Sequence, residues 1–161
     1  RAIPDYPKPG IIFQDITPVL ANGPLFGDVC AGMAEPFRGR VTHVVGIEAR
    51  GFILGGAVAR ELGVGFVPVR KPGKLPWKSV REEYQLEYGM DALEAHDDAV
   101  DRHARVVIVD DVLATGGTAR ATAALVRRLG AEVVGWSFMV EIAGLGGRSR
   151  LDGETRVICP V

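Results

Sequence analysis

Apolar runs and amphipathic stretches alternate along most of the chain. Nearly continuous apolar runs, the pattern of strands buried on both faces of a parallel sheet, occupy residues 41–47, 65–69, 105–109 and 133–140, with a last short strand near Val157. Stretches with helical periodicity, each stopped by a glycine, predict helices over residues 25–37, 52–62 and 118–129. This alternation predicts an α/β fold with a mostly parallel sheet.

Two segments break the alternation. Prolines and glycines interrupt the first two dozen residues, which predicts a tether with only residues 10–13 as a possible short strand. Residues 70–80 are basic and rich in proline and glycine, and residues 81–96 alternate polar and apolar positions with a bend at Gly89. We therefore expect a flexible loop and antiparallel ribbon, over about residues 70–96, inserted into the parallel architecture.

Length and composition fit one domain spanning residues 1–161, with 47% hydrophobic and 24% charged residues. The 19 basic and 20 acidic residues nearly balance, which argues against a globally basic nucleic-acid binder. No apolar run approaches the ~18 residues of a membrane helix. Cys30 and Cys159 form neither a disulfide framework nor a C-x-x-C spacing, so we expect a cytoplasmic protein. Because the chain begins at Arg1, we also expect further N-terminal sequence.

The richest candidate site follows the run at residues 105–109. In open α/β sheets, ligands bind beyond the carboxyl ends of the strands. There Asp110 and Asp111 lead into a Thr-Gly-Gly-Thr turn, residues 115–118, which opens a predicted helix. Such a turn presents backbone N–H groups and hydroxyls to a phosphate, although it lacks the Gly-Lys-Ser/Thr ending of a Walker loop. Each residue alone also fits a plain turn or helix cap, but the whole string favours a functional site.

Two other turns follow predicted strands in the same way. Residues 48–51 include Arg50, whose guanidinium suits bidentate phosphate binding. Residues 70–74 carry three further cations in the sequence Arg-Lys-Pro-Gly-Lys. Either turn alone is as well explained by solvated surface charge. Because all three turns follow strands of one parallel sheet, together they predict a polyphosphate pocket that contains carboxylates.

The string at residues 109–118, Val-Asp-Asp-Val-Leu-Ala-Thr-Gly-Gly-Thr, resembles the phosphoribosyl pyrophosphate (PRPP) signature of the type I phosphoribosyltransferases. Four further segments narrow the resemblance to the adenine phosphoribosyltransferases of that family, in the family's order and spacing: residues 3–10 with Phe13 after them, 48–52, 69–76 and 86–89. The resemblance implies the type I fold, a Rossmann-like, mostly parallel sheet flanked by helices. The ends depart from the family, which has a further N-terminal helix and rarely ends as residues 159–161 do.

The resemblance further implies purine salvage: the phosphoribosyl group of PRPP is transferred to N9 of adenine, giving AMP and pyrophosphate, with Mg²⁺ carried by PRPP. Asp110 and Asp111 would bind the ribose hydroxyls, where their charge suits the oxocarbenium-like cation of glycosyl transfer. The 5′-phosphate would contact Ala114, Thr115, Gly116, Gly117 and Thr118. The pyrophosphate would contact Arg50, Arg70, Lys71, Lys74 and Tyr88, with Arg70 reaching across a subunit interface.

The remaining roles concern adenine. By resemblance, Phe13 stacks on the base with Arg50 beside it, and Glu87 serves as the acid/base partner at the purine ring. Arg50 and Glu87 are thus the expected catalytic residues. From the residues alone, Phe13 is equally a packing phenylalanine and Glu87 the polar face of a strand. A homodimer is expected, with contacts from the early helix and the loop around Arg70, and no resident metal site.

Two other functions share parts of this pattern. A transferase for hypoxanthine, xanthine or orotate would carry the string at residues 109–118, but not both of the segments at residues 70–76 and 86–89. A non-catalytic, PRPP-sensing regulator would use an added DNA-binding domain, for which this near-neutral single domain leaves no room. A scaffold without a ligand gives no reason for three anion-binding turns along one edge of a sheet.

Overall fold

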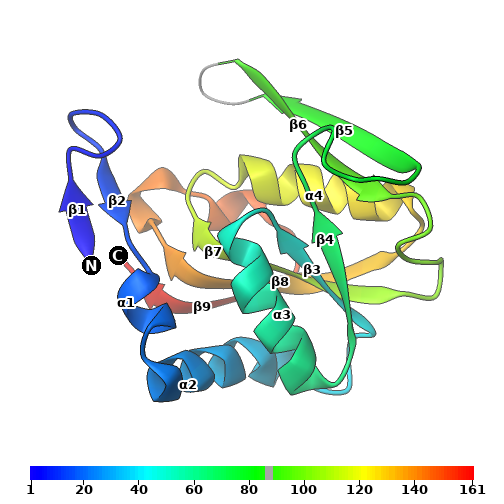
Figure 1. Cartoon of the computed structure of the whole chain (residues 1–161), viewed down its shortest axis with the longest axis horizontal. Helices are drawn as coiled ribbons and strands as arrows, with labels where there is room; N and C mark the ends of the chain where they lie inside the picture. Colours follow the sequence, from blue (N-terminus) through cyan, green and yellow to red (C-terminus); the bar gives the residue numbers. More distant parts are fainter. Residues whose placement is uncertain (86–88) are drawn as a thin grey trace.

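Five parallel strands form the centre of the computed structural model, which describes residues 1–85 and 89–161. Their order across the sheet is β4-β3-β7-β8-β9, and every neighbouring pair is parallel (Figure 1). The strands are β3 (His43–Ile47), β4 (Gly65–Val69), β7 (Arg105–Leu113), β8 (Glu132–Glu141) and β9 (Glu154–Pro160). The predicted α/β fold with a mostly parallel sheet is confirmed.

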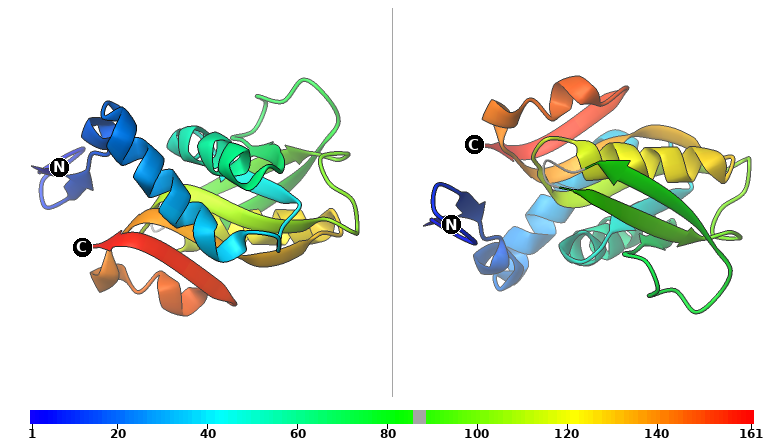
Figure 2. Two further views of the ribbon diagram at one scale, coloured as in Figure 1. Left: turned by 90° about the horizontal axis from the view of Figure 1, so that it is seen from below. Right: turned by 90° about the horizontal axis from the view of Figure 1, so that it is seen from above.

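Alternating side chains divide the core between the two faces of this sheet. Val45 and Ile108 belong to a cluster on the face covered by α4 (Gly117–Arg128), whereas Val44 and Val107 pack beneath α2 (Gly23–Ala34) and α3 (Arg50–Leu62). Figure 2 shows α2 and α3 on one side of the sheet and α4 on the other. Burial of both faces explains why these strands read as continuous apolar runs.

The predicted antiparallel ribbon is present as β5 (Ser79–Gln85) and β6 (Met90–His96). It packs on the α4 side, where Leu93 and Ala95 of β6 join the core (Figures 1 and 2). The ribbon is tied to the end of β4 because Arg70 and Glu94 exchange backbone hydrogen bonds of 2.9 and 2.8 Å. Residues 86–88 lie outside the described residues.

The N-terminal segment is more ordered than the predicted tether. Strands β1 (Ala2–Pro4) and β2 (Ile12–Gln14) form an antiparallel hairpin, followed by the short helix α1 (Thr17–Leu20). The backbone N–H and hydroxyl of Thr17, together with Arg1, bond to the Asp15 carboxylate and lower its pKa to about 2. Pairing between two separate short segments, which local composition does not encode, accounts for the missed hairpin.

Two other predictions need correction. The helix predicted over residues 25–37 ends at Ala34 and continues as a 3₁₀ turn, Glu35–Phe37. Strand β7 does not stop at Val109 but runs through both aspartates to Leu113, because its pairing with β8 continues to Leu113 after its pairing with β3 has ended. Asp110 and Asp111 therefore lie within a strand and not in a loop.

The strand order places a crevice beside β3. Helix α3 carries the chain from β3 to β4 on one side, whereas β7 pairs with the other side of β3. The order thus reverses between β3 and β7. In open parallel sheets, the carboxyl ends of strands at such a reversal are where ligands bind. The turns after β3 and β7 flank this point.

Candidate active site

A cavity of about 420 Å³ opens at the carboxyl ends of β3 and β7. Its wall includes side chains from all three turns singled out in the sequence: Glu48, Arg50, Lys71, Asp110, Asp111 and Thr118. A smaller cavity of about 90 Å³ adjoins it and is lined by residues 110 and 112–119 with Phe138. The fold therefore brings the two carboxylates, the Thr-Gly-Gly-Thr turn and two of the predicted cations to one place.

The two carboxylates have different environments. The side chain of Asp111 is 7% exposed and forms an ion pair with Nε of Arg50. Asp110 accepts a 2.9 Å hydrogen bond from the backbone N–H of Asp111. Burial, and then the negative charge of Asp111, raise the pKa of Asp110 well above its usual range. A Cβ on Gly51 would lie 2.8 Å from Oδ1 of Asp110, so glycine permits α3 to start this close to the strand.

Arg50 connects the carboxylates to the N-terminal hairpin. Its guanidinium carbon lies 5.1 Å from the centre of the Phe13 ring, within the range of a cation–π contact. Phe13 in turn makes an edge-on contact with Tyr6, at 5.2 Å between ring centres. Phe13 does not line the cavity itself, but Arg50 does. The hairpin thus lies against the cavity through an arginine that also holds Asp111.

The Thr-Gly-Gly-Thr turn leads into the N-terminus of α4. Gly116 is the N-cap residue of α4 and has φ +80°, a left-handed conformation suited to glycine. No side chain caps the helix, so Thr118 does not act as a cap. Uncapped N–H groups at a helix N-terminus, together with the helix dipole, favour a bound anion.

A glycine from a distant segment supports this turn from behind. Gly147 packs so closely that a Cβ there would overlap the carbonyl oxygen of Ala114. The next residue, Arg148, donates a 2.6 Å hydrogen bond to the buried Glu141, which fixes the segment in place. Gly147 therefore helps to shape the Thr-Gly-Gly-Thr turn.

Glu48 organises the basic segment at residues 70–74. Its carboxylate accepts hydrogen bonds from Nε of Arg70 at 3.2 Å and from the backbone N–H of Lys71 at 3.0 Å, and it pairs with the Lys74 ammonium. Burial opposes ionisation, but Lys74 and then Lys71 outweigh it and lower the pKa of Glu48 to about 2. Arg70 and Lys74 do not line the cavity. The sequence interpretation missed Glu48, whose partners lie 22 to 26 residues away.

Lys71 turns toward the ribbon. Its ammonium pairs with Asp91, and Oδ2 of that residue also accepts a 3.2 Å hydrogen bond from the Tyr84 hydroxyl. The same hydroxyl lies 3.4 Å from Oγ1 of Thr118. Burial lowers the pKa of Lys71, but the bond to Asp91 outweighs it and the net shift is upward, so Lys71 stays cationic. Neither Tyr84 nor Asp91 was among the predicted site residues.

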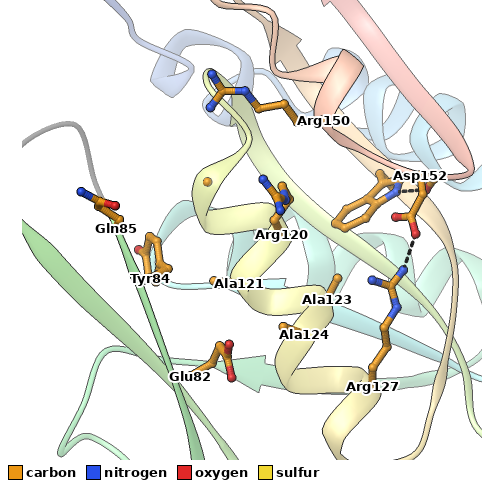
Figure 3. A pocket seen from close by; sticks show the side chains of 12 residues that line it. Glu82, Tyr84, Gln85, Arg120, Ala121, Ala123, Ala124, Arg127, Arg150 and Asp152 are labelled. Atoms are coloured by element: carbon orange, nitrogen blue, oxygen red, sulfur yellow. Dashed lines mark hydrogen bonds and ion pairs between the residues drawn. The ribbon is translucent and has the colours of Figure 1, made fainter.

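A larger cavity, about 560 Å³, lies beside α4. Its wall includes Glu82, Tyr84 and Gln85 of β5 and the alanine-rich face of α4, with a 2.7 Å ion pair between Arg127 and Asp152 (Figure 3). It lacks the paired carboxylates and most of the glycine turn. The paired carboxylates and the glycine turn therefore point to the two smaller cavities at the carboxyl end of β7.

Two of the predicted site residues belong to the part of the chain that the structure does not describe. Glu87 and Tyr88 lie outside the described residues. Within residues 1–85 and 89–161, no three His, Cys, Asp or Glu side chains gather as a metal site. None of the helices in that part of the chain is long and apolar enough to span a bilayer.

Comparison with known proteins agrees with this geometry. The family model "Phosphoribosyl transferase domain" matches residues 20–152. An adenine phosphoribosyltransferase of Myxococcus xanthus is 60% identical over 155 residues, covering 96% of this chain and 84% of the relative. The crystal structure of the enzyme from Rhodothermus marinus superposes with a TM-score of 0.95 at 52% identity, covering 100% of this chain and 93% of that one.

A third relative was solved with ligands. The Saccharomyces cerevisiae adenine phosphoribosyltransferase, complexed with an imino-altritol bisphosphate and adenine, has a TM-score of 0.92 at 39% identity. The match covers 98% of this chain and 93% of the yeast chain. Family, fold and site chemistry agree, and the chain belongs to the adenine phosphoribosyltransferases of the type I phosphoribosyltransferase family, the purine-salvage enzymes that form AMP.

Proposed function

We propose that residues 1–161 act as one domain in which the cavity between β3 and β7 binds PRPP along its length. The observation that carries this proposal is the convergence of three turns, after β3, β4 and β7, on one cavity of about 420 Å³. The 5′-phosphate binds to the turn at residues 114–118, where the N-terminus of α4 has no side-chain cap. The ribose hydroxyls bond to Asp110 and Asp111. The pyrophosphate extends toward Arg50 and Lys71, with Lys74 close by. We assign Tyr88 and, from the second subunit, Arg70 as further contacts of the pyrophosphate.

Adenine binds on the side of the cavity that faces the N-terminal hairpin. Phe13 stacks on the base, and the Arg50 guanidinium, 5.1 Å from the ring centre, lies between base and pyrophosphate. The adenine in the solved yeast relative supports a purine site in this fold. Edge contact with Tyr6 keeps the Phe13 ring oriented.

The chemistry is a displacement at the anomeric carbon of PRPP. The bond to pyrophosphate breaks, the electron pair leaves with pyrophosphate, and N9 of adenine forms the new bond. Positive charge develops on the ribose and is stabilised by the carboxylate of Asp111, which its ion pair with Arg50 holds in place. Glu87 accepts the proton that the purine ring loses as N9 forms its bond. Arg50 and Lys71 offset the charge of the leaving pyrophosphate.

Mg²⁺ enters as part of the substrate, bound to PRPP. Pyrophosphate carries several negative charges, and a divalent cation bound to its oxygens improves it as a leaving group. Most of the described carboxylates near the cavity are engaged with Arg50, Lys71 and Lys74, and no three of them gather as a metal site. Turnover should stop in excess chelator and return when Mg²⁺ is restored; undiminished turnover in chelator would overturn this assignment.

The working unit is a cytoplasmic homodimer. Leu25, Ile53 and Phe66, on α2, α3 and β4, leave 44%, 48% and 36% of their surface exposed, which supports contact of this face with a second copy. Arg70, at the end of β4, reaches the partner's site across that contact. The two cysteines are unpaired, in keeping with a reducing compartment. Sedimentation at micromolar concentration should give a dimer, and a fully active monomer would contradict it.

Base specificity is tested by competition. The protein is incubated with PRPP and Mg²⁺ in the presence of adenine, hypoxanthine, xanthine and orotate together, and nucleotides and pyrophosphate are quantified. AMP should be the predominant product, formed in equal amount with pyrophosphate. Preferential formation of another nucleotide would assign the site to a related base.

A further inference from the structure

One carboxylate beside the cavity has no part in the proposed binding of PRPP. Asp91, in β6, pairs through Oδ2 with the Lys71 ammonium and with the Tyr84 hydroxyl. Its Oδ1 accepts a 2.8 Å hydrogen bond from the backbone N–H of Ala92. Tyr84 is its register partner across the ribbon. Asp91 is therefore held from two strands with one oxygen aimed at Lys71.

This placement puts the negative charge of Asp91 beside Lys71, the group proposed to bind pyrophosphate. The Lys71 side chain is 42% exposed and lines the cavity, so it is accessible to a bound anion. In this structure the carboxylate of Asp91 is its partner. Burial opposes ionisation of Asp91, but the bond to Lys71 outweighs it and lowers the pKa, so Asp91 is anionic at neutral pH. A pyrophosphate that approaches Lys71 meets this negative charge and has to compete with it.

We propose that Asp91 is a positioning residue that competes with pyrophosphate for Lys71 and so promotes release of this product. The inference rests on the proposed role of Lys71 in binding pyrophosphate. Lys71 has two alternative partners, the product and Asp91. When pyrophosphate leaves, Asp91 takes over the ammonium group. The hydrogen bond from Tyr84 keeps the carboxylate in position for this exchange.

The test measures binding of magnesium pyrophosphate by calorimetry. Asp91→Asn retains the shape of the side chain but removes its charge, and Asp91→Ala removes the charge and the contact together. In both variants pyrophosphate should bind about two- to fivefold more tightly, the range expected for loss of one partly exposed competing ion pair. The gain should shrink at high ionic strength. Steady-state turnover should fall below the single-turnover rate, because release is slower.

Controls separate this role from a structural one. Glu83→Gln removes a negative charge from the same ribbon at a residue that pairs with Arg81 instead of Lys71, and it should leave pyrophosphate affinity unchanged. Asp91→Glu should retain the affinity of the parent protein. A merely structural role for Asp91 would instead weaken pyrophosphate binding in both neutral variants.

A third substitution distinguishes failure of this inference from failure of the proposed site. Lys71→Met should weaken pyrophosphate binding, and Asp91→Asn should have no further effect in that background. If Lys71→Met weakens binding but neutral variants of Asp91 do not tighten it, competition by Asp91 is overturned while the site stands. If Lys71→Met leaves affinity unchanged, the role of Lys71 is overturned, and the competition with it.

Discussion

Nε of Arg50 bonds to Oδ2 of Asp111 across the point where the strand order of the sheet reverses. The bond joins the first turn of α3 to the second carboxylate of β7. The same guanidinium lies 5.1 Å from the centre of the Phe13 ring. One planar cation therefore links the groups proposed to bind ribose, pyrophosphate and base.

This geometry predicts that a point charge does not replace Arg50. A lysine at this position would keep the charge but lose the planar group that spans Phe13 and Asp111. Arg50→Lys should lower kcat/KM for adenine by about 10- to 100-fold, equivalent to the ~1.5–3 kcal/mol of a hydrogen bond to a charged group. Steady-state kinetics measures kcat/KM for the variant and the parent protein. Arg60→Lys, at an exposed position of the same helix, is the control. Unchanged kcat/KM for Arg50→Lys would contradict the linking role.

A second prediction concerns the support of the turn at residues 114–118, which we propose to bind the 5′-phosphate. Gly147→Ala places a Cβ against the carbonyl oxygen of Ala114, too close for both to keep their places, so the turn has to shift. Overpacking of this kind costs ~1–3 kcal/mol, and we expect PRPP affinity to fall about tenfold or more. Gly144→Ala is the matched control, since a Cβ there meets nothing within 4 Å. Calorimetric titration with PRPP compares the two, and equal affinities would show that Gly147 does not shape the phosphate site.

A third prediction follows from the low pKa of Glu48. The folded pKa of about 2 lies below the ordinary value of 4.5, so Glu48 stabilises the fold above about pH 4.5. That contribution is lost as the pH falls toward 2. Glu48→Gln should therefore unfold at a lower temperature than the parent protein at pH 7. This difference in unfolding temperature should become smaller as the pH falls from 4.5 to 2. The measurement is the unfolding temperature of both proteins as a function of pH, with Glu132→Gln, which removes an exposed ion-pair partner, as the control. A difference in unfolding temperature that does not change with pH would exclude the mechanism.

Local sequence patterns predict much of this fold because its strands are buried on both faces. The strand predicted over residues 65–69 has the observed bounds of β4. The error at β7 has a tertiary cause: Val112 and Leu113 are strand residues only because Val140 and Glu141 of β8 pair with them. The possible strand at residues 10–13 overlaps β2 (Ile12–Gln14), but β1 and the hairpin pairing were missed for the same reason, since both strands are three residues long and stabilised by each other.

The site likewise contains residues that local sequence patterns predict and residues that only the tertiary structure identifies. Arg50, Lys71, Asp110, Asp111 and Thr118, which the sequence predicts at the site, lie in short strings after strands and line the cavity. Phe13, Arg70 and Lys74, predicted in the same way, do not line it. Glu48 and Asp91 hold those residues from positions 20 to 26 residues away, and neither stands out locally from a surface acid. From sequence, Tyr84 is only part of an alternating strand, yet its hydroxyl lies between Asp91 and Thr118. Partners of this kind are identified only once the fold is known.

The central claim separates binding of PRPP, by the turns around the cavity, from proton transfer at the purine by Glu87. It is tested most directly by single-turnover rates with adenine, measured beside PRPP affinity for Glu87→Gln. The amide keeps the shape of the side chain but does not exchange the proton. The single-turnover rate should fall by ~10²–10⁴-fold, the usual contribution of a placed acid or base, while PRPP affinity stays unchanged. A Glu87→Gln variant that keeps the parent single-turnover rate would contradict the account.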